Sequence, residues 1–215
     1  MKLVWSPETA SKAYIDTIKS CEARLESGVA ELVAAMAAGW NAQLIVETWS
    51  KGSVIATSVG LAVASRHTGG RHVCMVPDEA SQLEYFEAIE AAGGPPPEVI
   101  VGEPESAMEE LQGIDFMVVD CQRSDDSKVL RMAKLSSRGA VLVCKNAASS
   151  GADTASQWRS AVEGGSRRLV RSAFLPVGKG LEIAHVASTG GGKGGRRRWI
   201  KHWDQRSGEE IVIRR

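Results

Sequence analysis

The sequence has no long apolar run and few cysteines, and each shortage argues against a class of protein. No apolar stretch approaches the roughly 20 residues that a membrane-spanning helix needs, so we expect no membrane association. The first residues lack the apolar core of a secretory signal, which predicts an intracellular protein, cytoplasmic or nuclear. We expect the cysteines to be reduced and buried, with zinc and disulfides disfavoured, because no C-x-x-C pair occurs among Cys21, Cys74, Cys121 and Cys144.

Several catalytic motifs are missing as well, and the charge is unevenly distributed. The sequence contains no G-x-S-x-G elbow, no G-x-x-x-x-G-K-[ST] loop and no H-E-x-x-H helix. Hydrophobic residues make up 43% of the chain and charged residues 24%, which is typical of a globular protein. The formal net charge is zero, but residues 193–215 carry eight basic and three acidic side chains. A basic tail on an acidic body predicts a separate interaction surface.

The spacing of apolar residues predicts two amino-terminal helices followed by a regular α/β alternation. The first helix is predicted to have one apolar face, and a helix over 79–92 is predicted to have Leu83, Phe86 and Ile89 on one side. The apolar face of the first helix comprises Ala10, Ala13, Tyr14, Ile18, Cys21 and Leu25. Short apolar strands are predicted over 43–48, 72–76, 99–101, 116–119 and 140–144, with helices over 54–65, 79–92, 105–111, 127–135 and 154–162. Continuous apolar strands alternating with helices indicate a parallel sheet covered on both faces.

The end of the chain follows a different pattern. Two strands, 168–177 and 181–186, flank Gly178-Lys-Gly180, and so short a turn requires them to pair antiparallel. The sequence therefore predicts an α/β, Rossmann-like domain over 1–188, with a seven-stranded, mostly parallel sheet that closes with a hairpin. A glycine-rich linker over 189–195 and a basic, tryptophan-containing β-hairpin over 196–215 follow it.

Three segments of this domain resemble the class I S-adenosylmethionine-dependent methyltransferases, in particular the branch of small cation-dependent O-methyltransferases. They are Val99-Ile-Val-Gly-Glu-Pro104, Ile114-Asp-Phe-Met-Val-Val-Asp-Cys121 and Phe174-Leu-Pro-Val-Gly-Lys-Gly-Leu-Glu-Ile-Ala184. The resemblance covers roughly residues 6 to 188 and implies S-adenosylmethionine as the cofactor and a small molecule as the methyl acceptor. The whole chain, tail included, also resembles an uncharacterised plant family of unknown function assigned to that superfamily by fold.

The resemblance places the methionine end of the cofactor on the loop after the first strand. The family has the pattern E-x-G-x-x-x-G or E-x-G-x-G-x-G there, with Glu47 as its acidic residue and Trp49, Ser50 and Gly52 along the loop. Trp49 and Lys51 stand where glycines are expected, and a tryptophan there would fill the space of the cofactor. The alternative is an ordinary strand-to-helix turn in which Glu47 caps the helix.

Three residues after the second and third strands are candidates for the adenosine end of the cofactor. Asp78 lies one or two residues from the place of the carboxylate that binds ribose, and a simple helix N-cap is its alternative role. Gly102 and Glu103 match the adenine side of the family better, although Pro104 removes a backbone donor.

The resemblance also identifies the residues that would carry the chemistry. Asp120 and Asn146 match two ligands of the divalent cation, but Lys145 stands where the family has a second aspartate. An ammonium repels a cation, so we expect no metal and predict that Lys145 pairs with Asp120. If Lys145 is desolvated, it would instead deprotonate a substrate hydroxyl.

Two functions therefore stay open. One is a metal-independent methyltransferase-like protein that acts on a small molecule. The other is a methyltransferase fold without transfer chemistry, which serves as a binding or regulatory module with no small-molecule substrate. In that module the cations and tryptophans of residues 196–215 would contact nucleic acid or protein. The alternative for this hairpin is packing on the main sheet or on a second subunit in a homodimer.

Overall fold

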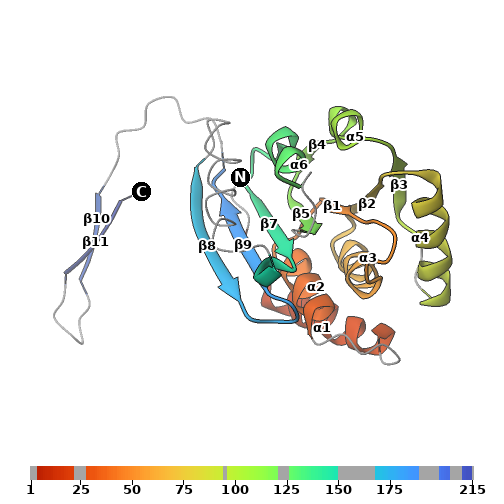
Figure 1. Ribbon diagram of the computed structural model, residues 1–215. Helices are drawn as coiled ribbons and strands as arrows, with labels where there is room; N and C mark the ends of the chain where they lie inside the picture. The colour runs from red at the N-terminus through yellow and green to blue at the C-terminus, as the bar shows by residue number, and fades with distance from the viewer. Residues whose placement is uncertain are drawn as a thin grey trace.

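The chain folds into an α/β domain preceded by two helices and followed by a separate hairpin (Figure 1). The computed structural model describes residues 4–21, 28–93, 96–120, 126–149, 168–188, 199–203 and 210–214. The helices are α1 (Pro7–Cys21), α2 (Val29–Gly39), α3 (Ala56–Thr68), α4 (Glu79–Ala91), α5 (Pro104–Glu110) and α6 (Asp126–Met132), with the 3-10 turn η1 (Ala147–Ser149). The main strands are β1 (Leu44–Thr48), β2 (Arg71–Val76), β3 (Glu98–Val101), β5 (Phe116–Asp120), β7 (Ala140–Lys145), β8 (Leu169–Leu175) and β9 (Leu181–Val186).

These seven strands form one sheet in the order β3-β2-β1-β5-β7-β9-β8. The first five strands of this order pair parallel, whereas β9 pairs antiparallel with both β7 and β8. The predicted Rossmann-like sheet with its closing hairpin is therefore confirmed. Since the parallel strands all point the same way, their carboxyl ends meet at one edge of the sheet.

Helices cover both faces of the sheet because side chains alternate along each buried strand. Ile45, Phe116 and Val141 point toward α1, α2 and α3 and pack in one core cluster with them. Their neighbours, such as Val46 and Met117, point to the other face and pack with residues of α5 and α6. A third cluster joins the ends of β1 and β2 to α3 and α4.

Two predicted helix faces are confirmed only in part, since Ala10, Ala13, Cys21 and Ile89 are buried as predicted but other members are exposed. In α1 the buried residues are Ala10, Ala13, Thr17 and Cys21, and Tyr14 and Ile18 are exposed. In α4 the buried residues are Ser81, Tyr85 and Ile89, whereas Leu83 and Phe86 are exposed. Helix α1 thus turns small and polar residues inward, and α4 turns Tyr85 inward because its hydroxyl donates to the buried carboxylate of Glu47 on β1.

Smaller elements also differ from the sequence pattern. The helix predicted over 127–135 ends at Met132, and Lys134–Leu135 forms β6, which pairs with β4 (Gln112–Ile114). The helix predicted over 154–162 lies outside the described residues. In the tail, β10 (Trp199–Trp203) pairs antiparallel with β11 (Glu210–Arg214). Among the described residues, no helix has the length and apolar character that a membrane span requires.

The expectation of reduced cysteines holds for two residues and is wrong for a third. Cys21 and Cys74 are buried thiols. Cys144, in the middle of the sheet on β7, is disulfide-bonded. The spacing of cysteines along the sequence is a poor guide to disulfide formation, because parallel strands place segments that are distant in sequence next to one another in the sheet.

Candidate functional site

The candidate site is the edge of the sheet where the parallel strands end. Glu47 lies near the end of β1 and the predicted loop from Trp49 to Gly52 follows that strand, while Asp78 follows β2 and Gly102 with Glu103 follows β3. At the ends of the next two strands lie Asp120 on β5 and the pair Lys145 and Asn146 on β7. The topology thus brings every predicted site residue to one edge, where ligands bind in open α/β sheets.

The loop between β1 and α3 is a tight turn that is tied to α4. The N–H of Ser53 donates to the carbonyl of Ser50 at 2.9 Å, and Gly52 has φ of +78°, a conformation that favours glycine. The N–H of Gly52 donates to Oε1 of Glu84 at 3.0 Å, while Lys51 Nζ lies 3.9 Å from Oε2 of the same carboxylate. The Glu84 carboxylate therefore accepts the hydrogen bond from the Gly52 N–H, a backbone donor that a cofactor loop would offer to its ligand.

Trp49 turns into the core at the start of this loop. Trp49 is only 2% exposed, and its indole ring packs edge to face against the Tyr85 ring at a centroid distance of 5.2 Å. The side chain packs in the cluster between the sheet, α3 and α4, and the backbone N–H of Trp49 donates to the carbonyl of Met75 at 2.9 Å. The indole thus lies beneath the loop, in the core.

Glu47 is fully buried and its carboxylate joins four elements of the fold. Oε1 accepts from Nε2 of His72 at 3.0 Å and from the hydroxyl of Tyr85 at 2.9 Å, and Oε2 accepts from Ser58 Oγ at 2.9 Å. Helix α3 itself begins after Ile55 without a side-chain cap, so Glu47 does not cap it. Both oxygens are already bonded within the protein, and a ligand would have to displace one of these donors.

The electrostatics of this cluster keep Glu47 ionised and Tyr85 protonated. Burial acts to raise the pKa of Glu47, but the hydrogen bond and charge of His72, the charge of Lys145 and the bond from Ser58 outweigh it, so the pKa is lowered. Burial, followed by the Glu47 charge, raises the pKa of Tyr85. Because a carboxylate only accepts, His72 must donate through Nε2.

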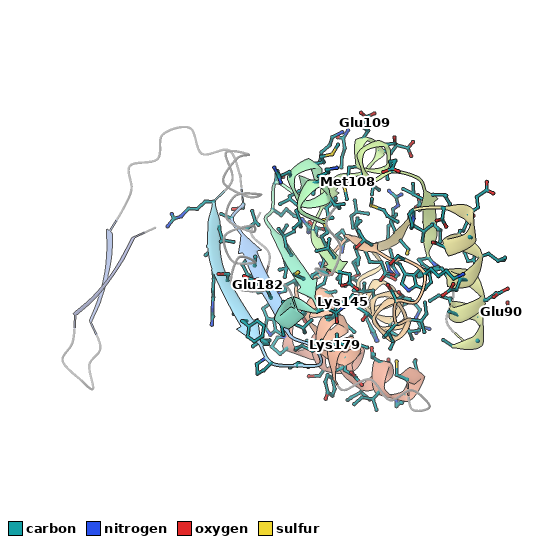
Figure 2. All side chains as sticks on the ribbon, in the orientation of Figure 1. Glu90, Met108, Glu109, Lys145, Lys179 and Glu182 are labelled. Carbon is teal, nitrogen blue, oxygen red and sulfur yellow. The ribbon has the colours of Figure 1, made fainter. Side chains whose placement is uncertain are left out.

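Lys145, Asp120 and Asn146 lie together where β5 and β7 end. Asp120 and Lys145 are register partners in the sheet, and Nδ2 of Asn146 donates to Oδ1 of Asp120 at 2.8 Å. Lys145 is 7% exposed and makes no ion pair with a described residue, so the predicted pairing with Asp120 is absent from this part of the chain. Figure 2 shows Lys145 beside the β8–β9 turn that carries Lys179, and the N–H of Ala148 donates to the Lys179 carbonyl at 3.1 Å.

The adenosine-side candidates differ in what they offer to a ligand. Asp78 is the N-cap of α4, and its Oδ1 accepts from the N–H of Ser81 at 2.7 Å, a bond that lowers the pKa of the carboxyl. Glu103 is exposed and its side chain does not cap α5. Gly102, with φ of +137°, donates its N–H to the Val76 carbonyl at 3.0 Å and turns the chain so that Glu103 follows at the edge.

The donor set does not suit a hard divalent cation, which prefers several oxygen ligands. At the ends of β5 and β7 the oxygens are one carboxylate and one amide that bond each other, with an ammonium beside them. Over the described ranges, no group of three or more His, Cys, Asp or Glu side chains is placed to hold a metal ion.

Sequence reasoning missed the partners of the predicted residues, which are Ser58, His72, Glu84 and Tyr85. A signal for part of this network was available. Glu47 and His72 are polar residues inside short apolar strands, and a buried charge requires partners. The sequence does not show that Tyr85 would supply one of them, because it lies outside the predicted apolar side of α4 formed by Leu83, Phe86 and Ile89.

Comparison with solved structures places this fold among the methyltransferases. An O-methyltransferase of Streptomyces achromogenes, TomG, involved in tomaymycin synthesis and solved with S-adenosylmethionine, is 21% identical with a TM-score of 0.57, over 86% of this chain and 92% of that one. A methyltransferase of Geobacter sulfurreducens is 21% identical with a TM-score of 0.55, over 82% and 88%. An O-methyltransferase of Bacillus cereus, solved with S-adenosylhomocysteine, is 16% identical with a TM-score of 0.55, over 86% and 93%.

These likenesses define the Rossmann-like methyltransferase fold. The chain belongs to the family described as "Protein of unknown function (DUF1442)", whose model matches residues 1–215. The search of curated proteins gave no significant match.

Proposed function

We propose that this protein binds S-adenosylmethionine and transfers its methyl group to a hydroxyl of a small molecule without a metal ion. The observation that carries the proposal is the exposed carboxylate of Glu103, which follows Gly102 at the carboxyl edge of a methyltransferase fold. Although Glu103 is the N-cap residue of α5, its side chain makes no cap hydrogen bond. It is the predicted adenosine-side acid whose side chain the fold leaves available, since Asp78 is engaged as a helix cap.

The residues at this edge suit the two ends of the cofactor unequally. Glu103 and Gly102 would hold the adenosine end, where a carboxylate accepts hydrogen bonds from ligand hydroxyls or amines. Ser50 and Gly52 would meet the methionine end, but the N–H of Gly52 must first leave Glu84. When bound, S-adenosylmethionine supplies an electrophilic methyl group, and the protein has to position the acceptor oxygen and stabilise the charge on it.

Lys145, Asp120 and Asn146 are placed to perform that second task. The Lys145 ammonium is nearly buried, where a charge acts more strongly than in water, and would stabilise a developing oxyanion. Asp120, held by Asn146, would accept the proton of the acceptor hydroxyl. In this arrangement a protein cation takes the place that a divalent ion has in the cation-dependent enzymes.

Calorimetric titration with S-adenosylmethionine and S-adenosylhomocysteine tests the cofactor. We expect saturable binding, weakened about tenfold or more in Glu103→Gln, because a hydrogen bond to a charged group contributes about 1.5–3 kcal/mol. Glu109→Gln is the matched control, since Glu109 is an exposed acid on the same helix and should leave the affinity unchanged. Titrations without heat at millimolar concentrations of both ligands would contradict the proposal.

A second candidate function is a binding module that has kept the fold and lost the transfer chemistry. Two observations favour it: Glu84 occupies the Gly52 amide, and all three donors around Glu47 are satisfied internally. In that case the division of the chain into a body over 1–188, a linker and a basic hairpin over 196–215 would separate scaffold from interaction surface.

Salt dependence tests the nucleic-acid form of this second candidate. If the tail contacts phosphates, affinity for a single-stranded oligonucleotide should fall at least about tenfold between about 50 and about 200 mM salt, because binding releases counterions. Fluorescence anisotropy of a labelled oligonucleotide measures it, with the triple change of Arg196, Arg197 and Arg198 to Gln as the variant. An affinity that ignores salt, or is unchanged in the variant, would rule this partner out.

A further inference from the structure

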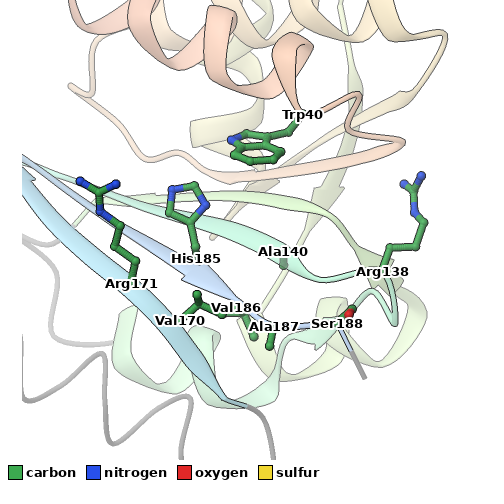
Figure 3. Close-up of a pocket in the computed structure, with 9 residues that line it drawn as sticks. All are labelled: Trp40, Arg138, Ala140, Val170, Arg171, His185, Val186, Ala187 and Ser188. Carbon is green, nitrogen blue, oxygen red and sulfur yellow. The ribbon is translucent and has the colours of Figure 1, made fainter. Parts of the chain in front are cut away.

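A cavity lies at the opposite edge of the sheet from the candidate methyltransferase site. Its volume is about 500 Å³, within the range of small-molecule pockets. Ala140 at the start of β7 and Val186 at the end of β9 belong to its wall, so it lies at the amino-terminal edge of the parallel strands. Figure 3 shows Arg171 and His185 rising toward Trp40, which follows α2.

The aromatic wall of this cavity is held in place before any ligand binds. Trp40 meets His185 edge to face at 5.5 Å, and Trp5 packs edge to face on Trp40 at 5.3 Å. Trp5 can approach because Gly39 has no side chain: a Cβ there would lie 2.3 Å from the Trp5 ring. The N–H of Ser6 also donates to the Gly39 carbonyl at 2.7 Å, which fixes the segment that carries Trp5. A fixed ring loses little entropy when a ligand stacks on it.

Two arginines give the cavity its charge. Arg138 donates to Oδ2 of Asp115 at 2.5 Å, and the same oxygen accepts from the N–H of Gln43 at 2.8 Å. Asp115 therefore fixes Arg138 and balances its charge. Burial, and then the charge of Arg171, lowers the pKa of His185, so its ring is neutral near neutral pH. Arg171 also lines the cavity, and no described residue forms an ion pair with it. The cavity therefore has a net charge of about +1 from Arg171.

A β-bulge shapes the remaining side of the cavity. The pairing of β8 with β9 shifts register between Leu169 and Arg171, so Val170 is an extra residue in the ladder. Val170 is 64% exposed and, with Val186, adds an apolar surface to the cavity wall. Bulges re-aim side chains and are frequent next to binding sites, and this one places an apolar side chain next to the Arg171 cation.

We propose that this cavity is a binding site for a planar aromatic carboxylate, with the ring against Trp40 and the exposed Val170 and the carboxylate on the guanidinium of Arg171. The aromatic wall suits a flat ring, and a single uncompensated guanidinium suits a monoanion, which it binds through two parallel hydrogen bonds. The basic tail of this chain is a poor occupant, because its charge has the sign of Arg171. The site is independent of the proposed methyl transfer, since it shares no residue with the carboxyl edge.

Calorimetric titration of the full chain with 2-naphthoate tests this site. We expect saturable binding at a single site, weakened about tenfold in Arg171→Gln and also weakened in Trp40→Leu, with thermal unfolding recorded for each variant. Arg66→Gln, which removes an exposed arginine outside the cavity wall, is the matched control. Glu103→Gln should also leave 2-naphthoate binding unchanged, which separates this site from the carboxyl edge.

Two ligand controls distinguish the proposed recognition from apolar adsorption. The neutral 2-naphthalenemethanol has the ring without the charge, and acetate has the charge without the ring, so both should bind at least tenfold more weakly. Equal affinity for 2-naphthalenemethanol and 2-naphthoate would overturn the proposal. So would equal 2-naphthoate affinity in Arg171→Gln and Arg66→Gln, or the absence of saturable binding at millimolar ligand.

Discussion

Replacing Glu47 by alanine is expected to lower the free energy of unfolding by about 3–5 kcal/mol, because it strips a buried hydrogen-bond network of its shared acceptor. Tyr85, His72 and Ser58 would each keep a buried polar group without its partner. For a chain of this length the loss corresponds to a decrease in Tm of roughly 10 °C. Urea denaturation followed by circular dichroism measures it.

Two further variants separate the network from simple loss of volume. Glu47→Gln keeps the size of the side chain and one good acceptor and should cost less than alanine, and a double-mutant cycle with Tyr85→Phe should show a coupling of about 1–3 kcal/mol. Additive effects of the two substitutions would contradict the network. So would a Glu47→Ala protein as stable as the parent.

The same carboxylate predicts how stability depends on pH. Because the folded pKa of Glu47 is lowered below its ordinary value of 4.5, its contribution to stability is fully present above about pH 4.5. The contribution is lost as the pH falls through the folded pKa, since the folded state then has to take up a proton that the unfolded state already holds. Stability curves of the parent and Glu47→Gln proteins should therefore converge as the pH falls below 4.5.

Trp49→Gly is expected to destabilise the protein by about 3–5 kcal/mol and to leave its affinity for S-adenosylmethionine no tighter. This substitution restores the glycine that the methyltransferase pattern has at this position. The indole lies in the core against Tyr85 and not at the edge, so its removal creates an internal cavity between α3 and α4 and frees no ligand space. Chemical denaturation and calorimetric titration, made on the same samples, measure the two effects.

Lys51→Gly is the matched control for this prediction. Lys51 occupies the other glycine position of the pattern, but it is exposed and touches Glu84 at only 3.9 Å. Its replacement should change the free energy of unfolding by less than about 1 kcal/mol. A Trp49→Gly protein that is as stable as Lys51→Gly, or that binds S-adenosylmethionine more tightly than the parent, would show that the indole occupies ligand space after all.

Most of the architecture could be predicted from the sequence because it depends on local patterns. Apolar strands such as Phe116–Asp120 are readable one by one, and the short turn at Gly178–Gly180 forces an antiparallel hairpin. The short pair β4 and β6 was not predictable, since Lys134–Leu135 has only two residues and continues a helical pattern. In α4 the tertiary environment overrode local periodicity: Tyr85 turns inward to reach Glu47, and Leu83 is left in solvent.

The candidate site was predictable as a place but not as a set of contacts. Parallel topology brings Asp78, Glu103 and Asp120 to one edge, and the order of strands and helices was sufficient to expect this. Which donor each acid would find depends on distances across the sheet. Asn146 bonds Asp120 although Lys145 is its register partner, because the left-handed backbone of Asn146, with φ of +59°, brings its amide back to the carboxylate.

The bond between Glu84 and Gly52 makes anion binding at the β1–α3 loop an exchange reaction. Any ligand carboxylate that takes the Gly52 amide has to release one already there, so the number of hydrogen bonds to the loop stays the same and their enthalpies largely cancel. The apparent affinity is then reduced by the fraction of molecules in which the loop is free, about fivefold if the internal bond contributes about 1 kcal/mol. Selection among ligands at this edge consequently rests on the contacts they make elsewhere, with Glu103 and with the Lys145 charge.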